Sequence, residues 1–138
     1  MKILTVDDSR MIRVIIKNTI KSLGFDVVEA ANADIALEVI EENQDINLIL
    51  LDWNMPGMNG YELLKILKKD ERFKNIPVMM VTTEGERKNV VKAIQAGAEN
   101  YLTKPFTPED LSTKVVECLG LASFEEENLD MDLDDLEL

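Results

Sequence analysis

Short apolar runs alternate with longer segments of helical period along roughly the first 120 residues of the chain. The short runs predict five β-strands, at residues 3–6, 25–29, 48–51, 78–81 and 100–103. The middle runs are apolar throughout, which is typical of strands buried on both faces of a parallel sheet. Strands that alternate with helices in this way predict an α/β fold in which helices cover both faces of the sheet.

The segments that follow these strands carry apolar residues at helical spacing and predict five helices. Ser9 is placed to cap the first helix and Gly24 to end it. The side chains that share the first helical stripe are Ile12, Ile15, Ile16, Thr19 and Leu23. The next three stripes are Ala36, Val39 and Ile40 after Asn32, then Leu63, Leu64 and Leu67 after Gly60, then Val90, Val91 and Ile94 before Gly97.

The fifth helix has the clearest start. The run Thr107-Pro108-Glu109-Asp110 supplies a capping threonine, a proline at the first helical position and acids in the first turn. The helix then continues through Leu111, Val115 and Leu119.

The composition changes near residue 122, so we predict one domain over residues 1–121 and a separate acidic segment over residues 122–138. The acids of this segment are Glu125, Glu126, Glu127, Asp130, Asp132, Asp134, Asp135 and Glu137, and no base accompanies them. Leucines alternate with these acids, as in disordered tails that either solubilise a protein or fold onto a partner groove.

The chain has 15 basic and 27 acidic residues and a net charge of −12, which makes nucleic acid an unsuitable partner. The acidic segment accounts for eight of these negative charges and leaves −4 for the rest of the chain. No apolar stretch approaches the roughly 20 residues of a membrane-spanning helix, and Asp7-Asp8 interrupts the apolar start too early for a signal peptide. We therefore expect a cytoplasmic protein without membrane insertion.

Two further features of the composition limit the chemistry. The only cysteine, Cys118, has no partner for an internal disulfide and falls on the apolar side of the last predicted helix, as a small core residue would. The chain has no histidine, which excludes histidine-based triads, metal sites and acid–base catalysis. Carboxylates, hydroxyls and lysines remain as the reactive groups.

Polar side chains follow four of the predicted strands at the point where each strand ends. Asp7 and Asp8 follow the first strand, Asp52 the third, Thr82 and Thr83 the fourth, and Lys104 the fifth. Ligands of open parallel sheets bind beyond the carboxyl ends of the strands. Three carboxylates at one edge repel each other unless cations neutralise them. The pattern therefore predicts that a bound Mg²⁺ ion and Lys104 together neutralise these acids.

Each piece of this pattern has an ordinary explanation when it is taken alone. Asp7-Asp8 and Asp52 can form solvated turns, Thr82-Thr83 can cap a helix, and Lys104-Pro105 can open an exposed loop. Solvation does not explain why all four ends of one sheet carry such groups together. The joint pattern favours a functional site.

These blocks resemble the motifs of response-regulator receiver domains, and the chemotaxis regulators are the nearest likeness. The matching segments are Val6-Asp7-Asp8-Ser9, Leu51-Asp52-Trp53-Asn54-Met55-Pro56-Gly57-Met58-Asn59-Gly60, Val81-Thr82-Thr83-Glu84 and Tyr101-Leu102-Thr103-Lys104-Pro105-Phe106. The resemblance covers residues 1 to about 120 and implies a doubly wound, flavodoxin-like sheet with strand order 2-1-3-4-5 and five flanking helices.

The resemblance also implies the role of each acid. Asp52 is the expected phosphoryl acceptor. Asp8, the Asp52 side chain and the backbone carbonyl of Asn54 are the expected direct Mg²⁺ ligands, with Asp7 acting largely through water.

Lys104 is expected to pair with the acceptor carboxylate and then with the phosphoryl oxygens, and the Lys104–Pro105 peptide bond is expected to be cis. Thr82 is expected to bond the phosphoryl group, and Tyr101 to turn inward as Thr82 moves. Asn54 and Glu84 are expected to tune self-dephosphorylation.

A receiver with about 18 residues after its last helix implies output by protein contact. The resemblance implies a monomeric signalling protein that catalyses its own phosphoryl transfer. A histidine kinase is the expected donor, a flagellar motor switch protein the expected target, and a phosphatase a possible third partner. The acidic segment would then either solubilise the protein or cover its own signalling face until phosphorylation releases it.

Three alternative hypotheses remain for the function: a phosphate sink outside chemotaxis, a pseudo-receiver that binds partners without phosphorylation, and a flavodoxin-type cofactor carrier. The last lacks a glycine-rich phosphate loop after the first strand, where Asp7-Asp8 would repel a phosphate without a metal.

Overall fold

The computed structural model describes residues 1–121, so the predicted acidic segment 122–138 lies outside the described residues. The strands are β1 (Lys2–Val6), β2 (Asp26–Ala30), β3 (Ile46–Leu51), β4 (Val78–Thr82) and β5 (Asn100–Thr103). The helices are α1 (Arg10–Ser22), α2 (Ala33–Glu42), α3 (Gly60–Lys69), α4 (Arg87–Gln95) and α5 (Pro108–Cys118). All predicted elements are present, with ends that differ by at most a few residues.

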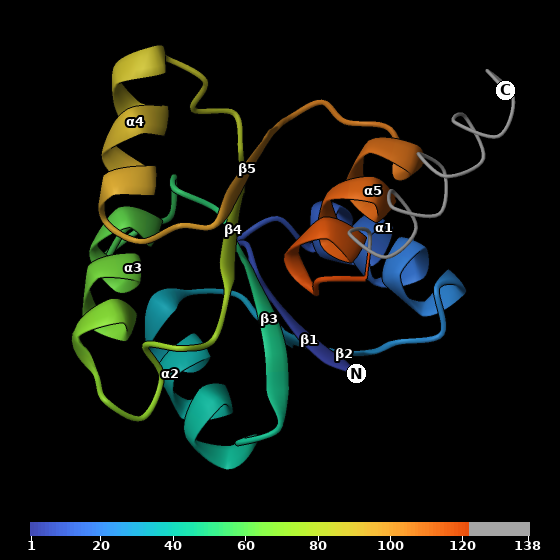
Figure 1. The fold of residues 1–138 in the computed structure, drawn as a ribbon, viewed down its shortest axis with the longest axis horizontal. Coiled ribbons are helices and arrows are strands. Elements are labelled where there is room, and N and C mark those ends of the chain that lie inside the picture. The colour runs from blue at the N-terminus through green and yellow to red at the C-terminus, as the bar shows by residue number, and fades with distance from the viewer. Residues whose placement is uncertain (122–138) are drawn as a thin grey trace, which may run out of the picture.

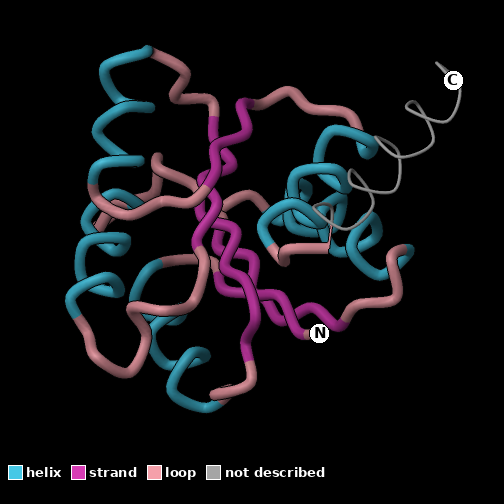
Figure 2. The backbone as a smooth tube through the Cα atoms, in the orientation of Figure 1, coloured by secondary structure: helices cyan, strands magenta, loops and turns pink. Residues whose placement is uncertain are grey.

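The strands form one parallel sheet in the order β2-β1-β3-β4-β5. Helices α2, α3 and α4 lie on one side of this sheet, and α1 and α5 lie on the other (Figure 1). Figure 2 shows the strands as a twisted central layer between the two helical layers. The predicted α/β class, the doubly wound arrangement and the strand order are therefore confirmed.

Two apolar cores fill the spaces on either side of the sheet. Successive residues of β1 point to opposite faces, as strand geometry requires, so Ile3 joins one core and Leu4 the other. The Leu4 core contains Leu63 and Leu64 of α3. The Ile3 core contains Ile16 of α1 and Leu111 and Val115 of α5. Because both faces are covered, every residue of β4 is buried.

Side-chain caps start four of the helices directly after strand ends or loops. Ser9, Asn32, Asn59 and Thr107 each accept a hydrogen bond from a backbone N–H in the first turn. Thr107 and Asp110 form a reciprocal capping box at the start of α5. These caps fix the first residue of α1, α2, α3 and α5 next to the sheet edge that carries the polar residues.

The face of α4 differs from the sequence-based expectation. Val91 and Ile94 were expected to face the core, but their side chains are 43% and 45% exposed, and Ala93 is the buried residue of this helix. In α1, Ile20 is buried while Ile15 is 41% exposed. Apolar spacing identifies each helix, but neighbouring elements decide its rotation about its own axis.

Candidate functional site

Three carboxylates meet at the carboxyl edge of the sheet. Asp7 and Asp8 follow β1, Asp52 follows β3, and these strands are hydrogen-bonded neighbours. Each carboxylate offers an oxygen within 4.8 Å of the others. Asp7 and Asp52 are only 2% and 5% exposed, whereas Asp8 is exposed. The acids that the sequence placed at strand ends therefore form one cluster.

Lys104 reaches this cluster from the end of β5. Its Nζ donates to Asp7 Oδ2 at 2.6 Å and to Asp52 Oδ2 at 3.4 Å. Its backbone N–H donates to the Thr82 carbonyl at 2.9 Å, which ties the loop after β5 to the end of β4. The Lys104–Pro105 bond is cis, as expected. The lysine thus lies between two of the acids, and closer to Asp7.

One ammonium does not balance three carboxylates. Two unit charges about 4 Å apart repel by roughly 4 kcal/mol at an effective dielectric constant of about 20. Burial raises the pKa of Asp7, and the Asp52 charge adds to this, while hydrogen bonds from Lys104 and Ser9 oppose it. Clustered carboxylate oxygens are the ligands that Mg²⁺ prefers. Asp7, Asp8 and Asp52 fit a divalent cation in donor type, spacing and uncompensated charge.

Asn54 lies in the loop after Asp52 and touches the ends of two strands. Its backbone N–H donates to Asp52 Oδ1 at 3.3 Å, and its side-chain Nδ2 donates to Thr83 Oγ1 at 3.4 Å. The loop therefore holds the Asp52 carboxylate in place from one side while Lys104 lies on another.

The backbone of Glu84 connects Thr82 with Tyr101. Thr82 is fully buried, and its Oγ1 accepts a hydrogen bond from the Glu84 N–H at 3.2 Å. The Tyr101 hydroxyl donates to the carbonyl oxygen of Glu84. Burial, with the nearby charges of Glu84 and Asp52, raises the pKa of Tyr101 to about 12, so the phenol remains a donor at neutral pH. Asn89 holds the Glu84 side chain through a 2.7 Å hydrogen bond.

Two residues support the acids through contacts that the sequence did not reveal. A Cβ built on Gly60 would stand 1.9 Å from the carbonyl oxygen of Asp52, so only glycine allows α3 to begin this close to the site. Arg13 donates to the Asp7 carbonyl at 2.6 Å and pairs with Glu29. The sequence indicated that a helix starts at Gly60, but not that Gly60 lies against the Asp52 carbonyl oxygen. The sequence did not indicate a role for Arg13, because its partners belong to different elements.

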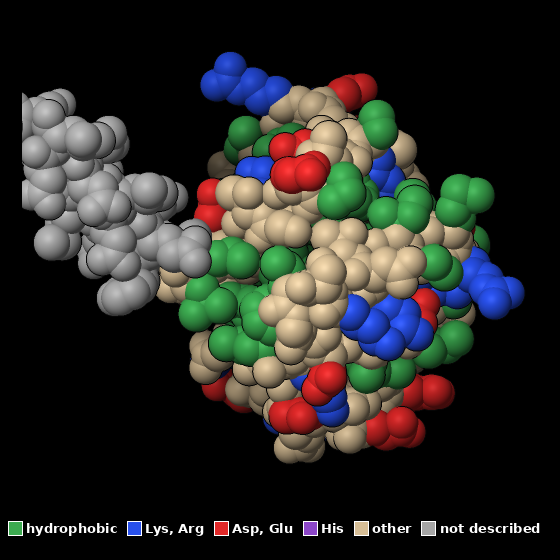
Figure 3. All heavy atoms as spheres, turned by 90° about the vertical axis from the view of Figure 1, so that its right-hand side faces the viewer, with side chains coloured by type: hydrophobic (Ala, Val, Ile, Leu, Met, Phe, Trp, Pro, Cys, Tyr) green, Lys and Arg blue, Asp and Glu red, His purple; other side chains and the backbone are tan. Residues whose placement is uncertain are grey.

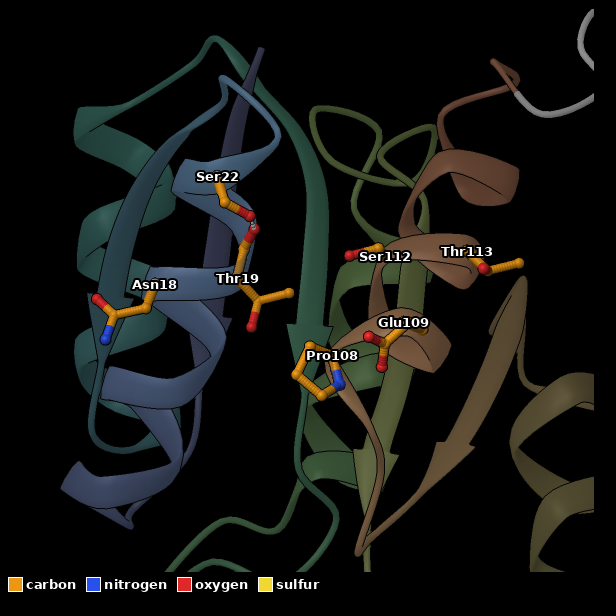
Figure 4. A pocket seen from close by; sticks show the side chains of 7 residues that line it. All are labelled: Asn18, Thr19, Ser22, Pro108, Glu109, Ser112 and Thr113. Carbon is orange, nitrogen blue, oxygen red and sulfur yellow. Dashed lines mark hydrogen bonds between the residues drawn. The ribbon is translucent and has the colours of Figure 1, made fainter.

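A separate hollow of about 560 Å³ lies between α1 and α5 (Figure 4). Its lining residues are Asn18, Thr19, Ser22, Pro108, Glu109, Ser112 and Thr113. It holds none of the expected site residues and offers one carboxylate without a lysine or arginine. The face that carries α1 and α5 shows apolar side chains between charged ones (Figure 3), and Met11 of α1 is 73% exposed. The acid cluster, and not this hollow, is the candidate site.

Within residues 1–121, no helix combines the length and the apolar character needed to cross a lipid bilayer.

Comparison with known proteins agrees with this geometry. Residues 3–116 match the response regulator receiver domain family. The chain is 49% identical over 121 residues to chemotaxis protein CheY1 of Helicobacter pylori, covering 87% of this chain and 98% of that protein. It is 45% identical over 126 residues to a chemotaxis protein CheY homolog of Campylobacter jejuni, covering 91% and 97% of the two chains.

Solved structures show the same relationship. Chemotaxis protein CheY4 of Vibrio cholerae superimposes with a TM-score of 0.80 at 34% identity, covering 86% of this chain and 98% of that one. A CheY-like receiver domain protein of Methanospirillum hungatei gives a TM-score of 0.77 at 36% identity, covering 91% and 97%. The order of the strands, the clustered acids beside Lys104 and these relatives lead to one conclusion: the chain belongs to the response regulator receiver domain family.

Proposed function

We propose that the protein is a chemotaxis-type response regulator in which Mg²⁺-dependent phosphorylation of Asp52 changes the affinity for a protein target. The observation that carries the proposal is the position of Asp52. Asp52 is 5% exposed, and its carboxylate shares a cluster with those of Asp7 and Asp8 and lies 3.4 Å from Nζ of Lys104. Such surroundings are not expected of an aspartate that only forms a solvated turn.

Asp7, Asp8, the Asp52 side chain and the Asn54 backbone carbonyl are the proposed Mg²⁺ ligands, with Asp7 acting largely through water. When bound, Mg²⁺ neutralises oxygens of the incoming phosphoryl group. The 3.3 Å hydrogen bond from the Asn54 N–H to Asp52 supports this assignment, because it holds the loop beside the acid cluster.

Asp52 acts as the nucleophile in the proposed reaction. One carboxylate oxygen forms a bond to phosphorus while the bond between phosphorus and the donor breaks, which gives an aspartyl phosphate. Modification replaces a charge of −1 with about −2. Lys104, now closer to Asp7, then has a stronger anion within reach and pairs with a phosphoryl oxygen.

Thr82 and Tyr101 are the proposed reporters of this new charge. The Thr82 hydroxyl accepts from the Glu84 N–H and still has a proton to donate to a phosphoryl oxygen. A shift of Thr82 toward the phosphoryl group pulls on Glu84, whose carbonyl holds the Tyr101 hydroxyl. Tyr101 is then free to turn inward, and the surface formed by α4, β5 and α5 changes. A target that prefers the changed surface shifts the population toward it.

The chemotaxis relatives direct the choice of partners. We propose a histidine kinase as phosphoryl donor, a flagellar motor switch protein as target and a cytoplasmic site of action. Asn54 and Glu84 are proposed to tune the loss of the phosphoryl group, alone or with a phosphatase. A phosphate sink would share the same chemistry but would lack a target whose affinity depends on phosphorylation.

The test uses Trp53, the single tryptophan and the neighbour of Asp52. Its fluorescence is followed during titration with Mg²⁺ and then with an acyl-phosphate donor, and the phosphorylated residue is identified by mass spectrometry. We expect a Mg²⁺-dependent change and then a second change that Asp52→Asn abolishes. Asp34→Asn is the matched control, because Asp34 is an exposed acid on α2 without an ion pair among the described residues.

Folded protein that responds to neither reagent would contradict the proposal and favour a pseudo-receiver. Phosphorylation of a residue other than Asp52 would contradict the assignment of the acceptor.

A further inference from the structure

A groove between α3 and α4 gathers positive charge in this acidic protein. The hollow has a volume of about 400 Å³ and is lined by Tyr61, Lys65, Lys68, Lys69, Lys92, Gln95 and Ala96. We call it the lysine groove. It contains no carboxylate, although acids outnumber bases by 27 to 15 in the whole chain.

Three of the four lysines lack a counter-charge within residues 1–121. Lys68 is engaged, since its Nζ donates to Glu99 at 2.9 Å and to the Ile76 carbonyl at 2.8 Å. Lys65, Lys69 and Lys92 are exposed, and no carboxylate of the described residues lies within ion-pair distance of them. An anion that enters the groove would meet three unpaired ammonium groups.

Two of these ammonium groups share one aromatic ring. The Nζ atoms of Lys65 and Lys92 lie 4.6 Å and 4.8 Å from the centre of the Tyr61 ring. Cation–π attraction holds each of them near the ring, but their like charges repel each other. An anion between them would relieve this repulsion, so the arrangement favours an acidic ligand with several charges.

We propose that residues 125–138 of this same chain bind in the lysine groove. This segment carries eight acids and no base, so its charge complements the groove. Its leucines offer apolar contact to the exposed Val91 and Ile94 of α4, one of the two helices that form the groove.

The end of the described chain lies close enough for this contact. Lys68 of the groove pairs with Glu99, the next residue Asn100 donates to Glu117 of α5 at 3.1 Å, and Leu121 follows four residues later. The groove and the end of α5 therefore both border the start of β5. At about 3.3 Å per residue, the stretch from residue 122 to residue 130 spans up to roughly 30 Å. This length lets the later acids reach Lys65 and Lys92 around the edge of the sheet.

The path has a consequence for the target surface. A segment that runs from α5 past the start of β5 into the groove lies along α4 and β5, the surface that the proposed function assigns to the target. The segment would then compete with the target inside the molecule. This consequence rests on the proposed function, whereas the binding itself does not.

The test is paramagnetic relaxation enhancement on the full chain, without Mg²⁺ or phosphoryl donor. A nitroxide is attached at Leu136→Cys in a Cys118→Ser background. We expect the amides of residues 61–69 and 91–96 to lose intensity and to regain it at high salt, since screening weakens surface ion pairs. The loss should shrink in Lys65→Glu and in Lys92→Glu, and disappear when both are changed.

Lys21→Glu is the matched control, because Lys21 is an exposed helical lysine of α1 without an ion pair among the described residues. It should leave the enhancement unchanged. A second variant replaces the eight acids of residues 125–138 with their amides, which removes the charge without touching the domain, and it should abolish the effect.

Three results would overturn the proposal. The first is no intensity loss in the groove, and the second is an equal loss in Lys21→Glu and Lys65→Glu. The third is a loss of the same size when the nitroxide and the isotope label are on different molecules that are mixed. The last result would mean that the acidic segment binds a second copy of the chain. All three leave the phosphorylation of Asp52 untouched, so the two proposals fail separately.

Discussion

Nζ of Lys104 lies 2.6 Å from Oδ2 of Asp7, and this ion pair is shorter than the 3.4 Å contact of the same lysine with Asp52. The pair is buried, since the two side chains are 12% and 3% exposed. Lys104 is therefore the main cation that the described chain supplies to its own acid cluster. In the proposed function it has to turn from Asp7 toward the phosphoryl group on Asp52.

Replacing Lys104 with methionine should lower the free energy of unfolding by about 3–5 kcal/mol without Mg²⁺, because Asp7 and Asp52 would remain buried without a counter-charge. Added Mg²⁺ should restore part of the loss. Urea denaturation with and without Mg²⁺ measures both effects. Lys21→Met, at an exposed site, should change stability by less than about 0.5 kcal/mol. Equal losses in the two variants would contradict the role of Lys104.

Replacing Gly60 with alanine should cost about 3 kcal/mol of stability, because the new Cβ would meet the Asp52 backbone and neither group can yield easily. The shift of Asp52 should also weaken Mg²⁺ binding, measured by calorimetry on the folded fraction. Gly85→Ala is the control, since its Cβ would lie 3.3 Å from a side-chain methyl group of Thr103 and at an ordinary contact distance of 3.9 Å from the Thr83 carbonyl oxygen. A Gly60→Ala protein with normal stability and normal Mg²⁺ affinity would refute the close contact.

Replacing Thr5 with valine should raise the free energy of unfolding by about 1 kcal/mol. Thr5 of β1 is 1% exposed, and its hydroxyl has no hydrogen-bond partner within the described residues. Valine has nearly the same shape and removes the unpaired group. The opposite result is expected for Thr82→Val, where the hydroxyl accepts from the Glu84 N–H and its loss leaves that donor unpaired. Both values come from chemical denaturation, and a destabilised Thr5→Val would show that the hydroxyl does have a partner.

Alkylation of Cys118 should be slow at neutral pH. Burial raises the pKa of this thiol from 9.0 to about 11, which disfavours the reactive thiolate. Because the folded pKa is raised, the native protein at pH 8 should hold roughly a hundredfold less thiolate than the unfolded chain. The rate of reaction with iodoacetamide, followed by mass spectrometry, should rise about tenfold per pH unit up to about pH 11. Levelling of the rate below pH 10, as in denatured protein, would contradict the burial of this group.

Local patterns were enough to predict the architecture and the chemical groups of the site. Buried apolar runs and helical stripes marked every element, because these periods depend only on near neighbours in the chain. The same alternation placed Asp7, Asp8, Asp52 and Lys104 at strand ends, and parallel strands bring those ends to one edge. The individual roles of Asp52, Thr82 and Tyr101 came from the likeness to receiver domains and stay predictions for this chain.

The contacts between elements could not be read from the sequence, because they depend on how each helix is rotated and on residues far apart in the chain. Ala93 is the residue of α4 that joins the core with Leu67 of α3 and Val78 of β4, whereas Val91 and Ile94 are exposed. The link from Thr82 to Tyr101 passes through the backbone of Glu84, whose peptide groups no side-chain pattern reveals. The lysine groove exists only because α3 and α4 lie side by side. The sequence by itself thus determined the fold class and the set of reactive groups, whereas tertiary packing decided which groups touch and which charges remain unpaired.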